Sequence, residues 1–348
     1  MKYILVDTAN IFFKARHIAS KRSSDWERIG MAIHLTLSGV NSIIRKMGGD
    51  SYHVVFCLEG RSWRKEFYKP YKANREEAKQ ALTEAEQQQD RMFWETYSQF
   101  TDFIRTKTNV SVLRCEIAEA DDLIARFIAL HPNDEHVIDS SDSDFTQLIA
   151  PNVVQYNSLS GNLITIDGVF DDRDRKLEFK IASNSKLKVG KPKSDFQVEP
   201  DWNKYALFLK CVRGDANDNV FSAYPGVRER GTKKTVGLME AYADRYNKGF
   251  NWNNLMLQRW VDHNEVQHRV LDDYERNRIL IDLTAQPEDI KQRIDDCIRE
   301  QLCKKEQVSG VGIHFLKFCG KYELVQLSEW CDSYAQWLNK EYTGALYA

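Results

Sequence analysis

The sequence predicts an α/β fold with a central, mostly parallel sheet, followed by a helical C-terminal half. Short apolar runs at residues 3–6 and 54–58 are typical of strands buried on both faces, and polar residues follow each run. Segments with helical spacing lie between such runs, which is the alternation that a parallel sheet requires. Helical patterns dominate from residue 202 onward. We therefore expect two domains, residues 1–200 and 201–348.

The elements of the first half follow from their local patterns. Residues 31–47 carry apolar side chains at helical spacing and end at two glycines, and residues 76–108 continue as a polar, then amphipathic, helix. Residues 123–130 have helical spacing, and residues 137–138 begin a short apolar strand. Residues 153–166 alternate around Ser-Gly-Asn and predict a hairpin.

The second half is predicted to be built from helices. Residues 202–212 and 236–246 have helical spacing, and a loop punctuated by glycines joins them. From residue 252 onward the chain is predicted to be helical, with amphipathic helices at residues 311–318 and 324–338. These last helices show no catalytic pattern.

Composition limits the class of protein. The 49 Lys and Arg residues nearly balance the 51 Asp and Glu residues, so contact with nucleic acid would need local segregation of basic charge. Seven cysteines, without a C-x-x-C pair, indicate reduced thiols rather than a disulfide framework or structural zinc. The sequence contains neither a signal peptide nor an apolar run of membrane-spanning length, so we expect a cytoplasmic protein.

Carboxylates gather where the predicted strands end and the predicted helices begin. Alone, each has an ordinary alternative, such as a helix N-cap for the first of them. Together, carboxylates at one edge of a sheet repel one another unless cations hold them, and such oxygen-rich sets bind hard divalent cations. Histidine is missing from the pattern, which argues against zinc. The candidate metal ligands are Asp7, Glu59, Glu119, Asp121, Asp122, Asp142, Asp144, Asp215 and Asp218.

Two basic segments accompany these acids. Residues 61–79 hold seven Lys and Arg against three Glu, with four aromatic residues interleaved, which suits single-stranded nucleic acid, although a solvated helix face is the commoner explanation. Residues 173–193 hold eight basic against two acidic residues, and Gly190 and Pro192 are typical of a loop, so the segment predicts either a flexible linker or a phosphate-contacting loop. A lysine pair near the start of helix 236–246 also suits a phosphate, or is an ordinary helix surface. The candidate phosphate contacts here are Lys186, Lys188, Lys233 and Lys234.

Five motifs occur in a fixed order along the chain. They are V-D-T-A-N-I, S-W-R-K-E-F-Y-K-P-Y-K-A-N-R, A-E-A-D-D-L-I-A, S-S-D-S-D-F-T-Q-L and G-D-A-N-D-N-V. Together they resemble the 5′-nuclease (flap endonuclease) family, and within it the bacteriophage ribonuclease H and 5′-exonuclease branch. The resemblance implies a PIN/5′-nuclease-like domain with a helical arch at about residues 61–108. It also implies a helix–three-turn–helix at residues 205–240.

The resemblance further implies a Mg²⁺-dependent 5′→3′ exonuclease and flap endonuclease that acts on DNA and on RNA primers during replication. The first metal ion would be held by Asp7, Glu119, Asp121 and Asp142, with Asp122 acting through water. The second ion would be held by Asp144, Asp215 and Asp218. At the base of the arch, Lys72 and Arg75 would steady the scissile phosphate, Arg64 and Lys65 would contact the 5′ strand, and Tyr71 would stack on the terminal base.

The cofactors implied are two Mg²⁺ ions, for which Mn²⁺ would substitute, and a K⁺ ion in the helix–three-turn–helix. The partners implied are branched or nicked DNA, RNA–DNA duplexes and replication proteins such as a single-strand-binding protein. The protein would act as a monomer, in the host cytoplasm if it is encoded by a phage.

The sequence departs from the family pattern in two places. The family has Asp in a Phe-Asp pair after the second strand, whereas this chain reads F-C-L-E-G. Glu59 would then act from a shifted position, because Cys57 is a poor ligand for Mg²⁺. The glycine-rich turn reads P-G-V-R-E-R-G-T-K-K-T, which lacks one glycine and adds one residue, so the K⁺ site is in question.

Two other functions compete with a nuclease. A catalytically silent protein that binds branched DNA gains nothing from concentrated negative charge that faces phosphates, so the complete acid set argues against it. A small-molecule Mg²⁺ phosphohydrolase would explain the strand-end Asp7 but not the basic and aromatic residues at 61–79.

Overall fold

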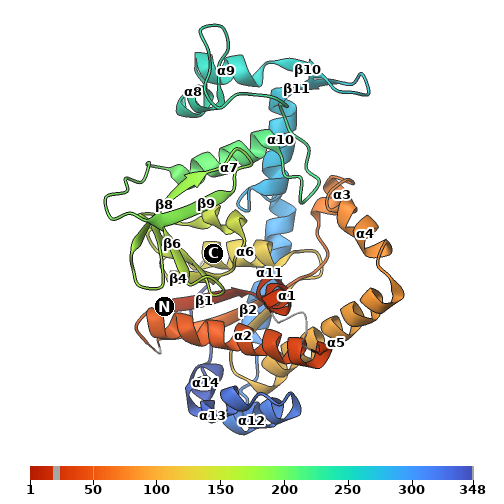
Figure 1. Cartoon of the computed structure of the whole chain (residues 1–348), viewed down its shortest axis with the longest axis vertical. Helices are drawn as coiled ribbons and strands as arrows, with labels where there is room; N and C mark the ends of the chain where they lie inside the picture. The colour runs from red at the N-terminus through yellow and green to blue at the C-terminus, as the bar shows by residue number, and fades with distance from the viewer. Residues whose placement is uncertain (19–23, 50, 347–348) are drawn as a thin grey trace.

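A computed structural model describes residues 1–18, 24–49 and 51–346 and places a nine-stranded sheet at the centre of the molecule (Figure 1). The strand order is β3-β2-β1-β4-β5-β6-β7-β8-β9. The parallel strands are β1 (Lys2–Asp7), β2 (Tyr52–Leu58), β3 (Ser111–Arg114), β4 (Glu135–Asp139) and β5 (Val153–Asn157). In their register, Asp7 lies opposite Cys57, so the carboxyl ends of these strands meet at one edge.

The remaining strands extend the sheet in antiparallel fashion. They are β6 (Asn162–Thr165), β7 (Gly168–Phe170), β8 (Lys176–Ile181) and β9 (Leu187–Pro192). The pairing of β5 with β6 confirms the predicted hairpin. The prediction of a loop or linker at residues 173–193 is wrong, because this basic segment forms β8 and β9. Pro192 is tolerated because β9 is the edge strand, where a missing N–H costs little.

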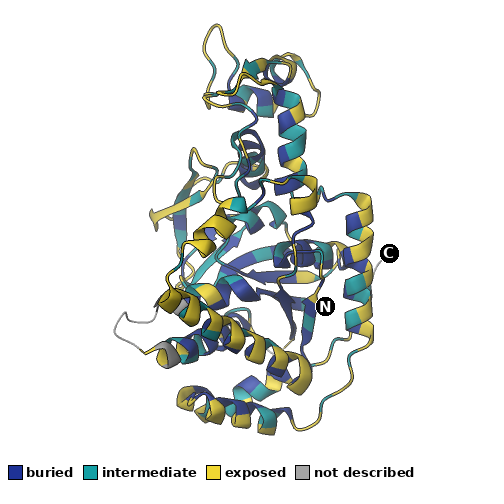
Figure 2. Cartoon of the chain, turned by 90° about the vertical axis from the view of Figure 1, so that its right-hand side faces the viewer, coloured by how far each residue is buried: buried dark blue, intermediate teal, exposed yellow. Residues whose placement is uncertain are grey.

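Helices cover both faces of the parallel part of the sheet, because successive side chains of β1 point to opposite sides. Ile4 and Val6 pack with α1 (Thr8–Ile18) and α2 (Asp25–Lys46). Tyr3 and Leu5 pack with α6 (Ala120–Leu130), while η1 (Ser143–Leu148) follows β4. Figure 2 shows the buried strands inside and the exposed outer faces of the helices. Among the described residues, no helix is both long enough and apolar enough to cross a membrane.

The segment between β2 and β3 bows out from the sheet as three helices, α3 (Arg64–Phe67), α4 (Ala73–Gln80) and α5 (Glu84–Lys107) (Figure 1). All residues of α4 are exposed or half-exposed, whereas the second half of α5 buries aromatic side chains such as Phe100 and Phe103. This agrees with the predicted change from a polar to an amphipathic helical segment within residues 76–108.

The C-terminal part is mainly helical, and its elements pack either in a separate small core or against the sheet. Its elements are α7 (Trp202–Arg213), α8 (Leu238–Ala243), α9 (Phe250–Met256), β10 (Arg259–Val261), β11 (Gln267–Arg269), α10 (Val270–Ile281), α11 (Glu288–Cys303), α12 (Val311–Lys321), α13 (Val325–Glu329) and α14 (Cys331–Leu338). The β10–β11 hairpin corrects the prediction of continuous helix from residue 252.

The elements from α7 to α10 share a separate small core that contains Phe208 and Trp252. By contrast, α11 packs against α6 on one face of the sheet, and α12 and α14 join the core on the other face. The packing of residues 201–348 is therefore divided between the separate small core and the two faces of the sheet.

Gly60 is the point where the chain after β2 touches the chain before α6. Its amide donates to the carbonyl oxygen of Ala118 at 2.9 Å. A Cβ atom at Gly60 would lie 1.9 Å from the carbonyl oxygen of Cys115 and 2.6 Å from that of Ala118. Both obstacles are backbone atoms, so Gly60→Ala is expected to lower the free energy of unfolding by about 1–3 kcal/mol. Urea denaturation followed by tryptophan fluorescence measures the change.

Gly320→Ala in α12 is the matched control, because a Cβ atom there meets no atom within 4 Å. Alanine restricts the unfolded chain and favours a helix, so this variant is expected to gain about 0.5–1 kcal/mol. Equal unfolding midpoints for the two variants would contradict the close contact at Gly60.

Candidate active site

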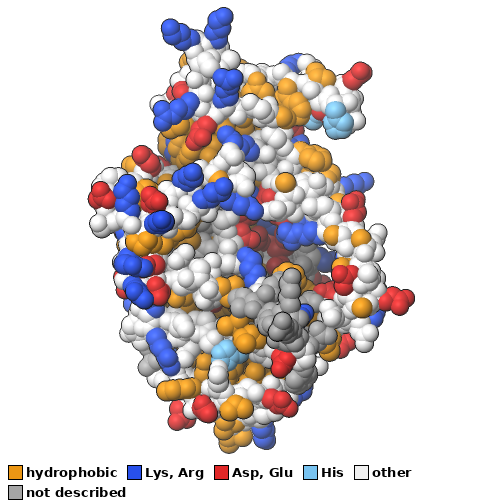
Figure 3. Space-filling view, in the orientation of Figure 1, with side chains coloured by type: hydrophobic (Ala, Val, Ile, Leu, Met, Phe, Trp, Pro, Cys, Tyr) orange, Lys and Arg blue, Asp and Glu red, His pale blue; other side chains and the backbone are white. Residues whose placement is uncertain are grey.

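An open cavity of about 720 Å³ lies at the carboxyl ends of the parallel strands. Figure 3 shows acidic side chains inside this hollow and Lys and Arg side chains around it. The acids come from the ends of β1 and β2, the start of α6, the turn after β4 and the loop after α7. Eight of the nine predicted ligands line the cavity, namely Asp7, Glu59, Glu119, Asp121, Asp142, Asp144, Asp215 and Asp218.

Local hydrogen bonds orient several of these carboxylates. Glu119 is the N-cap residue of α6, where unpaired amides and the helix dipole favour negative charge. The carboxylate of Asp142 accepts from the amide of Asp144 at 3.0 Å, and Asp142 is thereby the N-cap residue of η1. Asp7 Oδ2 accepts from Ser140 Oγ at 2.8 Å. The backbone at the strand ends therefore aims the side chains before any ligand binds.

Two groups of three carboxylates lie close enough to share a cation. In each group, one oxygen from every member lies within 4.8 Å of the others. The first group is Glu119, Asp121 and Asp122, and the second is Asp144, Asp215 and Asp218. Asp7, Glu59 and Asp142 line the same cavity but belong to neither group.

The carboxylates destabilise one another's charge. Burial and the charge of Glu59 raise the pKa of Asp7 to about 8. The cavity walls desolvate Glu59, and together with Glu119 they raise its pKa to about 6. Burial and the neighbouring Asp144 also raise the pKa of Asp142. A divalent cation would relieve this repulsion, so the set fits such an ion through its oxygen donors.

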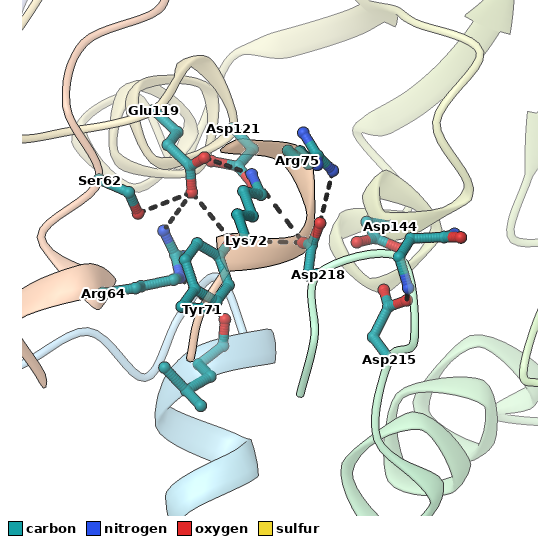
Figure 4. Close-up of polar contacts among 12 residues, drawn as sticks. Ser62, Arg64, Tyr71, Lys72, Arg75, Glu119, Asp121, Asp144, Asp215 and Asp218 are labelled. Atoms are coloured by element: carbon teal, nitrogen blue, oxygen red, sulfur yellow. Dashed lines mark hydrogen bonds and ion pairs between the residues drawn. The ribbon is translucent and has the colours of Figure 1, made fainter. Parts of the chain in front are cut away.

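Basic side chains from the base of the bowed helices reach directly into the acids. Lys72 Nζ donates to Glu119 Oε1 and lies 3.9 Å from Asp218 Oδ2, as Figure 4 shows. Arg75 Nη2 lies 2.5 Å from Asp218 Oδ1. Burial would raise the pKa of Glu119, but the positive charges of Lys72 and Arg64 outweigh burial and hold the pKa at about 2.

Lys210 is a residue of the site that sequence reasoning missed. Its ammonium lies 2.6 Å from both carboxylate oxygens of Asp144 and 2.6 Å from Asp215 Oδ2. Burial would raise the pKa of Asp215, but Lys210 lowers it below its ordinary value. The available signal was one charged residue inside the apolar run F-L-K-C-V, because a buried lysine needs a partner.

The predicted contact of Arg64 with a 5′ strand is wrong. The side chain of Arg64 is 1% exposed, and its Nη1 and Nη2 each donate to one carboxylate oxygen of Asp122 at 2.8 Å. Its Nε donates to the carbonyl oxygen of Leu280 at 2.8 Å. The guanidinium is therefore used inside the protein and is not available to DNA.

Asp122 and Tyr71 are also used inside the protein. Asp122 is fully buried, and its oxygens also accept from Trp63 Nε1 at 3.1 Å and Gln286 Nε2 at 3.0 Å, so it orients Arg64 rather than facing the cavity. The ring of Tyr71 is 3% exposed, and its hydroxyl donates to Glu119 Oε2 at 2.9 Å. This burial contradicts the predicted stacking of Tyr71 on a terminal base.

The other predicted contacts are compatible with their positions but stay predictions. Lys65 is exposed and paired with Glu76, and Lys186 lies on the cavity wall. Glu59 lines the cavity, and its Oε2 accepts from the amide of Ala120 at 3.1 Å, whereas Cys57 is fully buried in the core. The side chains of Lys188, Lys233 and Lys234 are exposed.

Residues 2–174, about half of the chain, match the family model of the 5′-3′ exonuclease N-terminal resolvase-like domain. The chain therefore belongs to the 5′-3′ exonuclease family. It is 23% identical to a 5′-3′ exonuclease of Mycoplasmopsis pulmonis over 68% of this chain and 66% of that protein. It is 26% identical to flap endonuclease Xni of Shewanella loihica over 51% of this chain and 61% of that protein. The match thus covers less than two thirds of either relative.

Similar solved structures show the same fold. A metal-bound crystal structure of the bacteriophage T5 protein has a TM-score of 0.52 and 18% identity, over 86% of this chain and 99% of that one. A complex of the T5 flap endonuclease with DNA and metal ions has a TM-score of 0.53 and 19% identity, over 86% and 98%. The T5 5′-exonuclease with bound zinc has a TM-score of 0.53 and 18% identity, over 86% and 99%.

Arg64→Met tests the buried ion pair beneath the site. The variant leaves the carboxylate of Asp122 buried without its charged partner, so the free energy of unfolding is expected to fall by about 3–5 kcal/mol. Urea denaturation measures the loss. A loss below about 1 kcal/mol would instead indicate an arginine at the surface.

The matched control is Arg105→Met, which removes a pair with Asp102 whose side chains are 66% and 57% exposed. Screening by solvent makes such a pair worth little, so a change within about 0.5 kcal/mol is expected.

Proposed function

We propose that this protein is a divalent-metal-dependent 5′→3′ exonuclease and flap endonuclease. It hydrolyses phosphodiester bonds at 5′ ends, at flaps and in RNA primers of RNA–DNA duplexes. The convergence of eight carboxylates in one open cavity beside basic helices carries this proposal. Family membership supports the direction of action, and the T5 enzyme described with DNA and metal ions supports the kind of substrate.

The donor set fits Mg²⁺ or Mn²⁺ because every predicted ligand offers carboxylate oxygen, which hard cations prefer. Burial raises the pKa of Asp7 and of Asp142, and a cation bound beside these groups would offset the cost of their buried charge. When bound, two such ions supply a strong nucleophile from water and stabilise negative charge on the phosphate. The proposed ligands are Asp7, Glu119, Asp121 and Asp142 for the first ion, with Glu59 nearby, and Asp144, Asp215 and Asp218 for the second.

The chain's own cations complete the site. Lys72 has a left-handed backbone conformation with φ of 54°, and its amide donates to the carbonyl oxygen of Asp218 at 2.9 Å. This anchors the base of the bowed helices over the cavity, so the side chains of Lys72 and Arg75, which pair with Glu119 and Asp218, would meet a phosphate bound beside these carboxylates. Fixed positive charge there stabilises the charge that develops during hydrolysis.

Exposed lysines mark the proposed path of the nucleic acid. Lys186 lies on the cavity wall, and Lys65, Lys188, Lys233 and Lys234 would each neutralise a phosphate, so affinity should fall as salt rises. In this proposal residues 1–200 supply most of the chemistry, joined by Asp215 and Asp218, and residues 201–348 otherwise grip the duplex, with a K⁺ ion in the turn between α7 and α8. A monomeric replication enzyme of phage origin, working in the host cytoplasm beside a single-strand-binding protein, completes the proposal.

Asp142→Asn tests the proposed chemistry. The substitution removes one negative charge from the first proposed ion site, so cleavage of a 5′-labelled flap substrate is expected to fall about a hundredfold or more. Binding of the same DNA, measured by fluorescence anisotropy, should persist because the basic contacts remain. Turnover close to that of the wild type would show that Asp142 is not a ligand. A wild-type protein that cleaves nothing with Mg²⁺ or Mn²⁺ would be a silent DNA-binding protein.

Glu59→Gln tests the ligand at the shifted position. Loss of this charge should raise the Mg²⁺ concentration needed for half-maximal cleavage by about tenfold, because a cation loses one carboxylate of its cavity. The control is Glu116→Gln, which removes an exposed carboxylate outside this cavity and should leave the Mg²⁺ dependence unchanged. Identical Mg²⁺ dependence in the two variants would exclude Glu59 as a ligand.

A further inference from the structure

Lys210 is a charged residue on a helix that is otherwise held by apolar packing. Leu209 and Cys211, its neighbours in α7, are each 1% exposed, and the side chain of Lys210 itself is 13% exposed. Helix α7 packs Trp202 against the sheet and contributes Phe208 to the small core. The backbone position of Lys210 is therefore fixed, and its ammonium can change place only by rotation of its own side chain.

The ammonium of Lys210 uses all of its hydrogen-bonding capacity on carboxylates. It lies 2.6 Å from Asp144 Oδ1, 2.6 Å from Asp144 Oδ2 and 2.6 Å from Asp215 Oδ2. A lysine ammonium has three N–H donors, so three such contacts leave none for a phosphate. In this arrangement Lys210 neutralises the acid cluster and does not bind substrate.

The same oxygens belong to the second proposed cation site. Asp144, Asp215 and Asp218 place their carboxylate oxygens within 4.8 Å of one another, and Lys210 contacts two of the three. A divalent cation that binds these oxygens would lie close to the ammonium, in a half-buried site. Two positive charges at that separation repel strongly, so the ion and the ammonium exclude each other.

The first proposed site differs in how its lysine is held. Lys72 contacts Glu119 from the turn before α4, and the residues of α4 are exposed or half-exposed. Lys72 therefore lies beside an exposed helix, in a turn whose backbone is tied to Asp218, whereas Lys210 is carried by a buried helix. The two lysines are thus held by different parts of the fold.

We infer that Lys210 is an internal counterion that occupies the second cation site in the metal-free protein and must rotate away before a divalent cation binds there. Asp144 and Asp215 are metal ligands only under the proposed function, on which this inference rests. Lys210 is thereby a positioning residue. Its competing ammonium lowers the affinity of the second site for a divalent cation. It also offsets the repulsion between the carboxylates while the site holds no divalent ion.

Mn²⁺ binding to Lys210→Met tests the competition directly. Methionine keeps the apolar stem and removes the charge, so the second Mn²⁺ dissociation constant, measured by electron paramagnetic resonance of free Mn²⁺, should fall about tenfold. The control is Lys204→Met on the same helix, where the lysine is 58% exposed and paired with Asp201, and it should match the wild type. A second-site constant in Lys210→Met that is unchanged or raised overturns the inference.

If Lys210→Met does not fold, a measurement on the wild-type protein tests the displacement of Lys210 instead. Acetylation of lysine amines, followed by peptide mass spectrometry with and without Mn²⁺, compares the accessibility of Lys210 in the two states. Its modification rate should rise several-fold with saturating Mn²⁺, while the rate at Lys204 stays constant. A rate at Lys210 that Mn²⁺ leaves unchanged contradicts displacement.

The two ideas fail in different ways. Wild-type cleavage of a flap substrate with Mg²⁺, combined with unchanged second-site affinity in Lys210→Met, refutes only the counterion role. Absence of both Mn²⁺ binding and cleavage in the wild type refutes the proposed function and the counterion role together.

Discussion

Repulsion among carboxylates in one cavity is the constraint on which the rest of the structure depends. Eight acids converge there, and cations from separate segments, among them Arg64, Lys72 and Lys210, offset part of their charge. Arg64 follows β2, Lys72 precedes α4, and Lys210 lies on α7, and each is paired with an acid far away in the sequence. The electrostatic balance therefore also ties the bowed helices and the C-terminal helices to the ends of the strands.

The strands and the convergence of the acids were predictable, because both follow from local pattern and sheet geometry. Apolar runs define β1, β2 and β4, and parallel pairing brings the residues that follow each strand to one edge. The partners of Arg64 and Lys210 were not predictable. Arg64 meets Asp122 across 58 residues and Lys210 meets Asp144 across 66, and no local signal encodes such pairs.

The basic segment that forms β8 and β9 shows why composition misled the prediction. Lysines such as Lys180, Lys188 and Lys191 are exposed, and a segment with this much charge favours a loop when strand pairing is ignored. A strand at the edge of a sheet benefits from such residues, because exposed charge prevents pairing with the edge of another molecule. The prediction of a loop therefore gave Gly190, Pro192 and the lysine charge more weight than strand pairing, which only the fold reveals.

The return of the C-terminal helices to the sheet also constrains how the protein folds during synthesis. Phe103 of α5 stacks on Phe318 of α12 with ring centroids 4.1 Å apart, so one face of the sheet is completed by residues near the end of the chain. The nascent sheet leaves the ribosome with apolar surface uncovered until α12 and α14 emerge. Pairings of such long sequence separation slow folding, and the interval exposes the chain to chaperones and to aggregation.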